Sequence, residues 1–349
     1  MINRQQLVSA VLGVSMVWLS SSPADAGAFI GASDANPDRI LHPRGYDGTG
    51  GVVTVGICID PDSIAVSEME IPLRNVIAVW NALEPTTGNV RRGDGSELDP
   101  DQIDWESTIL HEVGHCIGLS HPNLASESPV ASADRNYTKT GAGPNGVFDL
   151  DAGADGVKGS ADDVRGDDLN RHWYQNGVNN PFTLPATVDF TTYSRTLENL
   201  PPGDLFPANG DLTVSALYGV PNTEASMQQG ARSGEEQRTL VADDVATLRL
   251  GMSGLDEIAG TADDYTVHLV YAGVSDSCDL VVRLINTSSF AFCSSSRTTI
   301  EGNHQRITSS SVTTGDFNWF FTTERIGGEE IFSDGFESGD TTLWTAAIR

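Results

Sequence analysis

Three histidines and one glutamate stand in a short segment whose spacing is suited to binding a metal ion. The segment reads His111-Glu112-Val113-Gly114-His115-Cys116-Ile117-Gly118-Leu119-Ser120-His121. His111 and His115 are four residues apart, so on a helix both imidazoles lie on one face and can reach the same ion. Gly118 can adopt a backbone conformation that ends the helix and brings His121 in as a third ligand. Three protein ligands leave one position of a tetrahedral zinc ion open, which is typical of a catalytic site.

Glu112 lies beside the first of these ligands, where its carboxylate can hold and deprotonate a zinc-activated water instead of binding the metal. The simpler interpretation is that all of these are ordinary helix residues. Against it, the long pattern fixes five positions, and three of them are histidines in a chain that has only 7. We therefore expect zinc at His111, His115 and His121, with Glu112 as the general base.

The same segment resembles a known family. Its pattern H-E-x-G-H-x-x-G-L-x-H, preceded by Asp104 to Leu110, is similar to that of the metzincin zinc endopeptidases, and within them to the matrixin-like branch. The resemblance covers roughly residues 50–125 and 215–250. It implies an α+β catalytic domain with a twisted mixed sheet, two long helices and zinc in the cleft. It also implies that the substrate is a protein or peptide.

The chain departs from the matrixin pattern after the third ligand. In that family a methionine-containing turn follows closely, but the best candidate here, Met227, comes over a hundred residues later. The resemblance implies that Met227 forms a hydrophobic floor beneath the zinc ligands. Support comes from Leu240 to Leu248, which resembles the closing helix of the matrixins, whereas the rival Met252 follows that helix. The cysteine of the family's inhibitory propeptide is absent between Gly27 and Val52.

Hydrophobic periodicity predicts the elements that position the site. A β-branched run from Val52 to Ile59 predicts a buried strand, and apolar residues at helical intervals predict a helix from Ser67 to Leu83. We expect an irregular arm at 29–51 before them, more sheet after that helix, and then a zinc helix that begins near Trp105.

We expect four regions in the chain. They are a signal peptide at 1–26, a catalytic domain at 27–253 with an insertion at about 123–222, a small β-rich domain at 254–330, and a C-terminal tail motif at 331–349. In the β-rich region, short strands are predicted at 265–271, 280–285, 290–292 and 317–322, separated by turns rich in threonine and serine.

Composition and the N-terminal sequence bear on location and partners. The net charge of -28 and the pI near 4.3 argue against nucleic-acid binding, which needs a basic surface. Arg4, the apolar stretch Leu7 to Leu19 and the small residues before Gly27 are typical of a signal peptide. No later stretch is apolar enough to cross a bilayer. We therefore expect export to the exterior, the periplasm or the cell surface.

Four cysteines in an exported chain suggest two disulfide bridges with three possible connectivities. We favour Cys58–Cys116 and Cys278–Cys293, with free buried thiols in the first pair as the alternative. Cys116 follows a ligand directly and points away from the metal-facing side of the helix, so it is not expected to bind zinc.

The predicted insertion has a composition of its own. Its segment 145–163 alternates carboxylates with glycine, and a related G-x-D-x-x-x-G-[S/T]-A-D-D segment recurs at 254–264. Such carboxylates repel one another unless a hard cation binds them, so we expect a calcium site there, with a solvated acidic loop as the alternative. The candidate calcium ligands are Asp149, Asp151, Asp155, Asp162 and Asp163.

Two other functions remain compatible with the residues. One is a zinc amidase that acts on a non-protein substrate. The other is a non-catalytic surface or adhesion protein that binds zinc or calcium and keeps the zinc fold.

Overall fold

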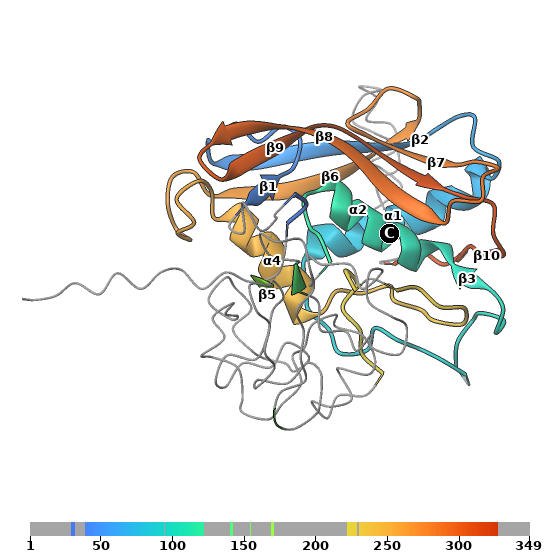
Figure 1. Ribbon diagram of the computed structural model, residues 1–349. Helices are drawn as coiled ribbons and strands as arrows, with labels where there is room; N and C mark the ends of the chain where they lie inside the picture. The colour runs from blue at the N-terminus through green and yellow to red at the C-terminus, as the bar shows by residue number, and fades with distance from the viewer. Residues whose placement is uncertain are drawn as a thin grey trace, which may run out of the picture.

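The computed structural model describes residues 29–31, 39–93, 95–121, 140–141, 154, 169–170, 222–228 and 230–326. The predicted signal peptide, nearly all of the insertion and the C-terminal tail motif lie outside these residues. What is described is an α+β arrangement in which helices α1 and α2 lie beneath a mostly parallel sheet (Figure 1).

Two strands from the N-terminal part of the chain and four that follow the last helix form the main sheet. The strands are β1 (Ile40–His42), β2 (Gly51–Ile59), β6 (Tyr265–Val274), β7 (Leu280–Leu284), β8 (Ala291–Glu301) and β9 (His304–Thr314). They lie in the order β6-β2-β7-β9-β8, with β1 beside the start of β9. Every pairing is parallel except that of β8 with β9. Two-residue pairs join β3 (Ile103–Asp104) to β10 (Trp319–Phe320) and β4 (Thr140–Gly141) to β5 (Leu169–Asn170).

The helices among the described residues are α1 (Val66–Ala82), α2 (Trp105–Cys116) and α4 (Ala242–Met252). All three lie where hydrophobic periodicity or the family resemblance predicted a helix. Their buried faces form one core with the sheet, in which Leu73 and Trp80 of α1 meet Val113 of α2. The Trp80 indole also donates a hydrogen bond of 3.0 Å to the carbonyl of Leu110, which satisfies its buried N–H and joins the two helices.

The order of elements along the chain differs from our expectation. In the described part of the chain between α1 and α2, the only strand is the two-residue β3, not the further sheet that we expected. The missing strands come from 265–314, which we had assigned to a separate small β domain, and that assignment is wrong. Strand β2 pairs with β6 on one edge and with β7 on the other. A buried strand needs hydrogen-bonding partners on both edges, but its sequence does not say how far along the chain they lie.

Residues 294–299 and 308–311 were expected to be turns because they are rich in serine and threonine. They instead lie within strands β8 and β9, which form a hairpin whose tight turn lies at Gly302 with φ 53°. Side chains that point to solvent in a half-exposed hairpin need not be apolar, and threonine is itself a good strand former. The arm at 29–51 is likewise not wholly irregular, since it contains β1.

Two disulfide bridges are present, as expected, but the predicted pairing is wrong. Cys58 is bonded to Cys278 and Cys116 is bonded to Cys293. Successive side chains of a strand point to opposite faces, and the neighbours of Cys58 in β2, Ile57 and Ile59, belong to the core that packs on the helices. Cys58 therefore points away from α2 and cannot reach Cys116.

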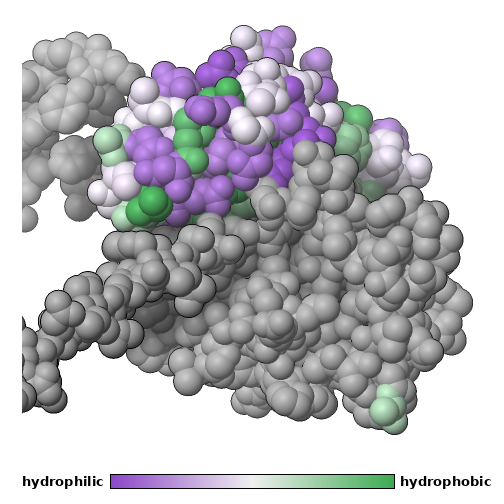
Figure 2. Space-filling model, turned by 60° about the vertical axis from the view of Figure 1, so that its left-hand side comes forward, coloured by the Kyte–Doolittle hydropathy of each residue, from purple (hydrophilic) through white to green (hydrophobic). Residues whose placement is uncertain are grey.

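The surface of the described part is mainly polar. Figure 2 shows one face of the molecule, on which hydrophilic residues predominate and hydrophobic side chains appear as separate spots. The exposed large hydrophobic residues include Val52 in β2, Val274 in β6 and Phe292 in β8. Among the described residues, no helix has the length and apolar character required to span a membrane.

Candidate metal centre

Helix α2 begins at a well-satisfied N-terminus that holds it in place. Asp104, the N-cap, accepts hydrogen bonds from the backbone amide of Ser107 at 3.3 Å and from Arg238 through both carboxylate oxygens, at 2.7 and 3.0 Å. Such a cap satisfies a helix N–H that has no partner within the helix, and the bidentate arginine fixes the cap itself. The helix is thereby anchored about two turns before its first histidine.

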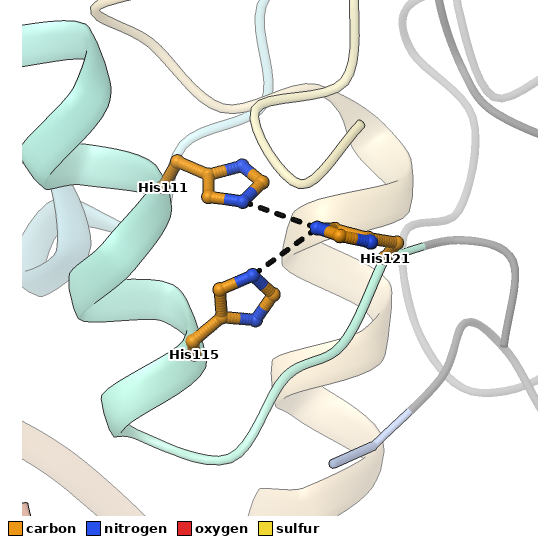
Figure 3. Close-up of side chains that lie close together, drawn as sticks. All are labelled: His111, His115 and His121. Carbon is orange, nitrogen blue, oxygen red and sulfur yellow. Dashed lines mark hydrogen bonds between the residues drawn. The ribbon is translucent and has the colours of Figure 1, made fainter. Parts of the chain in front are cut away.

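The three predicted zinc ligands converge on one point. His111 and His115 project from the same face of α2, and His121 comes back from the loop that follows it (Figure 3). The Nε2 atom of His121 lies 3.3 Å from Nε2 of His115 and 3.3 Å from Nε2 of His111. Nitrogen ligands of a tetrahedral zinc ion, each about 2.0–2.1 Å from the metal, lie about 3.3 Å apart. The spacing of the three nitrogens therefore fits zinc.

Backbone carbonyls set the orientation of the two helix histidines. Nδ1 of His111 donates to the carbonyl of Ser226 at 2.6 Å, and Nδ1 of His115 donates to the carbonyl of Leu119 at 2.8 Å. A neutral imidazole that carries its proton on Nδ1 has a lone pair on Nε2, which is the form that binds a metal. Burial, with a contribution from His115, lowers the pKa of His111 to about 3, and burial lowers that of His115 to about 4.

These protonation states suit the cluster to a bound cation. Both helix histidines present an Nε2 lone pair to His121, and His121 can place at most one proton on the nitrogen that faces them. Hydrogen bonding alone therefore leaves two lone pairs in contact, whereas one cation satisfies all three. Among the described residues, these are the only three histidine, cysteine, aspartate or glutamate side chains grouped closely enough to hold a metal.

The loop that carries His121 depends on Gly118, as the sequence predicted. Gly118 has φ 124°, and a Cβ atom there would lie 2.1 Å from the carbonyl oxygen of Leu41 in β1. On its other side, the amide of Ile30 donates to the carbonyl of Gly118 at 3.0 Å, and Phe29 forms a β-bridge with Leu119. The loop is thus held between β1 and the arm that precedes it.

Met227 lies against α2 at Gly114, beneath the helix that carries His111 and His115. It is buried in a turn, and a Cβ atom added to Gly114 would lie 2.4 Å from its sulfur. Gly114 therefore allows α2 to lie directly on the methionine. The turn is fixed from α4, because Asp244 accepts hydrogen bonds from the amides of Ser226 at 2.9 Å and Met227 at 3.1 Å.

Asp244 therefore acts on the metal ligand through one peptide group. The peptide between Ser226 and Met227 donates its N–H to Asp244 and accepts from His111 at its carbonyl. Burial raises the pKa of Asp244 to about 6, so the group is ionised at neutral pH and remains an acceptor. A carboxylate on one side of a peptide makes the carbonyl on the other side a stronger acceptor.

We expect Asp244→Asn to weaken metal binding by about 10- to 100-fold, because supporting groups of metal ligands typically contribute that much. It should also lower the free energy of unfolding by about 1–3 kcal/mol, since the new amide turns an N–H toward backbone N–H donors. Chelator competition and thermal melting measure the two effects. Asp243→Asn is the matched control, because the adjacent Asp243 makes no hydrogen bond to this turn in the described structure. Equal metal affinities of the two variants would contradict the effect of Asp244 on His111 through the Ser226–Met227 peptide.

Glu112 is set apart from the metal ligands and faces the cleft. Its side chain is 6% exposed, and its Oε2 atom has no hydrogen-bond partner in the described part of the chain. Burial raises the pKa of Glu112 to about 7, while a hydrogen bond from the backbone amide of Cys293 in β8 lowers it. A buried oxygen of this kind normally has a partner, so the free oxygen indicates a place for a water or a substrate atom.

The cleft around these residues has a volume of about 610 Å³. Its floor is α2 with the three histidines and Glu112. One wall is formed by Phe290 and the first residues of β8, 291–293. The other is formed by residues 228, 230–232, 235 and 237, which follow Met227. The arm contributes Ile30 near the third ligand. The cleft is large enough for several residues of an extended peptide.

Sequence reasoning found the three histidines and Glu112, but missed the groups that orient them. Those groups are the carbonyls of Ser226 and Leu119, the amide of Cys293, and the side chain of Asp244. Three of the four are backbone atoms, which leave no signal in residue type. The sequence contained a signal only for Asp244, which stands in the helix expected to close the domain.

The five candidate calcium ligands, Asp149, Asp151, Asp155, Asp162 and Asp163, lie outside the described residues. The related segment at 254–264 is described, and backbone amides donate hydrogen bonds to its three aspartates. Asp263 accepts from the amides of Leu255 at 2.5 Å and Asp256 at 3.3 Å, and Asp264 accepts from Gly260 at 2.5 Å. This copy of the repeat is therefore stabilised by its own loop.

No family model matches the chain, and neither the curated proteins nor the solved structures contain a match to it.

Proposed function

We propose that the protein is an exported zinc-dependent endopeptidase similar to the matrixin-like metzincins. The observation that carries the proposal is the convergence of three imidazole nitrogens beside a buried carboxylate whose outer oxygen is free, in one open cleft. The three-nitrogen set suits zinc and leaves a coordination position for a reacting group. The two disulfides and the lack of a membrane-spanning helix among the described residues are compatible with an extracellular protein.

The edge of β8 favours a peptide as the substrate over a small non-protein amide. In the described sheet β8 pairs with β9 alone, so its other edge is open, and its first residues line the cleft beside Glu112. Open strand edges bind extended peptides through main-chain hydrogen bonds. A peptide that pairs with this edge would place a peptide bond over the histidines.

The residues of the chain have distinct parts in the proposed hydrolysis. His111, His115 and His121 would hold zinc, which supplies a Lewis acid that polarises the scissile carbonyl and lowers the pKa of a water. Glu112 would take a proton from the attacking water and return it to the leaving amine. The amide of Cys293 would keep one oxygen of Glu112 in place while the free Oε2 moves the proton.

Hydrolysis of casein and of a quenched peptide library by the full-length secreted protein tests this function. Zinc-loaded protein should cleave both, metal-stripped protein should cleave neither, and restored zinc should restore activity. His121→Ala should lose both zinc and activity, because two imidazoles bind zinc far more weakly than three. Protein with one equivalent of zinc that cleaves no peptide would reject the proposal and favour a non-catalytic binding protein.

Calcium in the insertion remains a prediction. We expect calcium to raise the melting temperature and the protease resistance of the wild type, with a smaller gain after Asp155→Ala and Asp163→Ala. Asp264→Ala provides a comparison, since it removes the carboxylate that corresponds to Asp163 from the described copy, where the amide of Gly260 donates to it. Identical melting curves in millimolar calcium and in a calcium-selective chelator would leave only the solvated-loop interpretation.

A further inference from the structure

The bridge between Cys116 and Cys293 lies against the proposed general base. Cys116 is the last residue of α2 and directly follows His115. It is four residues after Glu112, so the two side chains leave the same face of the helix one turn apart. Cys293 belongs to β8 and lines the cleft. The disulfide thus joins the metal-binding helix to the wall of the cleft at the level of Glu112.

Cys293 of β8 contacts both Cys116 and Glu112. The sulfur of Cys293 is bonded to Cys116, and its backbone amide donates a hydrogen bond to the carboxylate of Glu112. The covalent bond therefore fixes the distance between α2 and the very amide that orients Glu112. In the described sheet this strand is an edge, supported by β9 on one side only. An edge strand that moved by about 1 Å would lose a hydrogen bond of this kind.

The second bridge provides a natural comparison. Cys58–Cys278 joins β2 to the segment before β7, and neither cysteine lines the cleft. The two bridges span 177 and 220 residues along the chain. Because the loop-closure entropy of the unfolded chain varies only with the logarithm of loop length, both should stabilise the fold to a similar extent. The two bridges differ in their surroundings, since Cys293 of the first lines the cleft and neither cysteine of the second does.

We propose that Cys116–Cys293 is a positioning element for catalysis, which holds the amide of Cys293 against Glu112 so that the free carboxylate oxygen faces the reacting water. This inference rests on the proposed hydrolytic function. It assigns to one disulfide a role in turnover that the other does not have. Neither cysteine touches the substrate's reacting atoms, so the bridge acts through Glu112.

The test compares two double variants of the full-length protein, Cys116→Ala/Cys293→Ala and Cys58→Ala/Cys278→Ala, each loaded with one equivalent of zinc. Both should lose thermal stability to a similar extent. The first should lose about 10- to 100-fold in kcat with a smaller change in KM, because displacement of a catalytic group by about 1 Å lowers the rate by that order. The second should keep kcat within about twofold of the wild type.

Amide hydrogen exchange supplies a readout that does not depend on activity. In the first variant, exchange in peptides that cover the start of β8 should rise by at least tenfold, whereas peptides that cover β2 should be unchanged. Equal kcat values in the two variants, or unchanged exchange in β8, would overturn the proposal. Loss of zinc by the first variant alone would also overturn it, since the bridge would then serve His115 and not Glu112.

If the first variant does not fold, the folded wild type can be reduced with a phosphine, alkylated, desalted and reloaded with zinc. Mass mapping then identifies molecules in which only Cys116 and Cys293 are alkylated, and these should show the same fall in kcat. A wild type without peptidase activity would reject the proposed function, whereas the exchange measurement would still test the link between β8 and α2.

Discussion

Replacement of Glu112 by glutamine is expected to lower kcat by about 10²- to 10⁴-fold while one equivalent of zinc stays bound. Glutamine has nearly the same shape and can still accept the hydrogen bond from Cys293, but its amide cannot take up a proton at neutral pH. The three ligand nitrogens belong to other side chains, so their geometry should persist. Steady-state kinetics on a quenched peptide, together with metal analysis of the same sample, measures both parts of the prediction.

Glu106→Gln is a matched control for this experiment. Glu106 lies on the same helix and is also buried, and burial raises its pKa to about 8. Its carboxyl group accepts a hydrogen bond from Asn75 at 2.9 Å, away from the cleft, and is mostly neutral at pH 7. Glutamine should therefore replace it with little change in kcat. Normal turnover by Glu112→Gln, or an equal loss in Glu106→Gln, would remove the general-base role from Glu112.

The activity of the wild type should fall as the pH is lowered, because only the ionised form of Glu112 can accept a proton. Burial raises the pKa of Glu112 to about 7 in the protein without a cation, and a bound zinc ion lowers it again by attracting the negative charge. The acidic limb of the kcat profile should therefore lie below pH 7. In Glu112→Gln the residual rate should no longer show this limb.

Gly118→Ala is expected to have the second-largest effect, through loss of the third metal ligand. At φ 124° an alanine is strained by about 1–3 kcal/mol, and its Cβ would also lie 2.1 Å from the carbonyl of Leu41. The backbone of β1 cannot move away easily, because β1 pairs with β9. The loop must therefore shift and carry His121 out of reach of the other two imidazoles. We expect zinc affinity to fall by at least 100-fold, with loss of peptidase activity.

Gly51→Ala separates the strain from the clash. Gly51 has φ 126°, almost the same as that of Gly118, but a Cβ atom there meets nothing within 4 Å. That variant should lose stability through strain alone and keep its zinc affinity. Competition with a chelator and thermal melting of both variants measure the difference. Wild-type zinc affinity in Gly118→Ala would show that the close approach to β1 does not set the position of His121.

The local elements of the site could be read from the sequence because short-range pattern determines them. The spacing of His111 and His115 required a helix, and α2 begins at Trp105 as expected. The β-branched run that became β2 and the apolar periodicity of α1 were equally local signals. Gly118 was correctly identified as the residue with a special backbone conformation just after the end of α2. Few residues other than glycine accept its positive φ.

The long-range partners could not be predicted in the same way. The sequence indicates that a strand edge or a cysteine needs a partner, but it does not indicate which residue the partner is. For this reason the strands within 265–314 were expected in a small β-rich domain at 254–330 and not beside β2, and Cys58 was expected to pair with Cys116. Alternation along β2 turns Cys58 away from α2, a consequence that appears only once the sheet and the helices are stacked.

The sequence by itself therefore determined the candidates for chemistry, namely His111, His115, His121 and Glu112, because metal binding and proton transfer depend on residue type and on spacing within a few turns. Only the tertiary structure decided how those side chains are held. The carbonyl of Ser226 comes from a turn over a hundred residues away, and the amide of Cys293 comes from the strand that a disulfide ties to the helix. Backbone groups are the same in every residue but proline, so folding alone selects which of them meet the site.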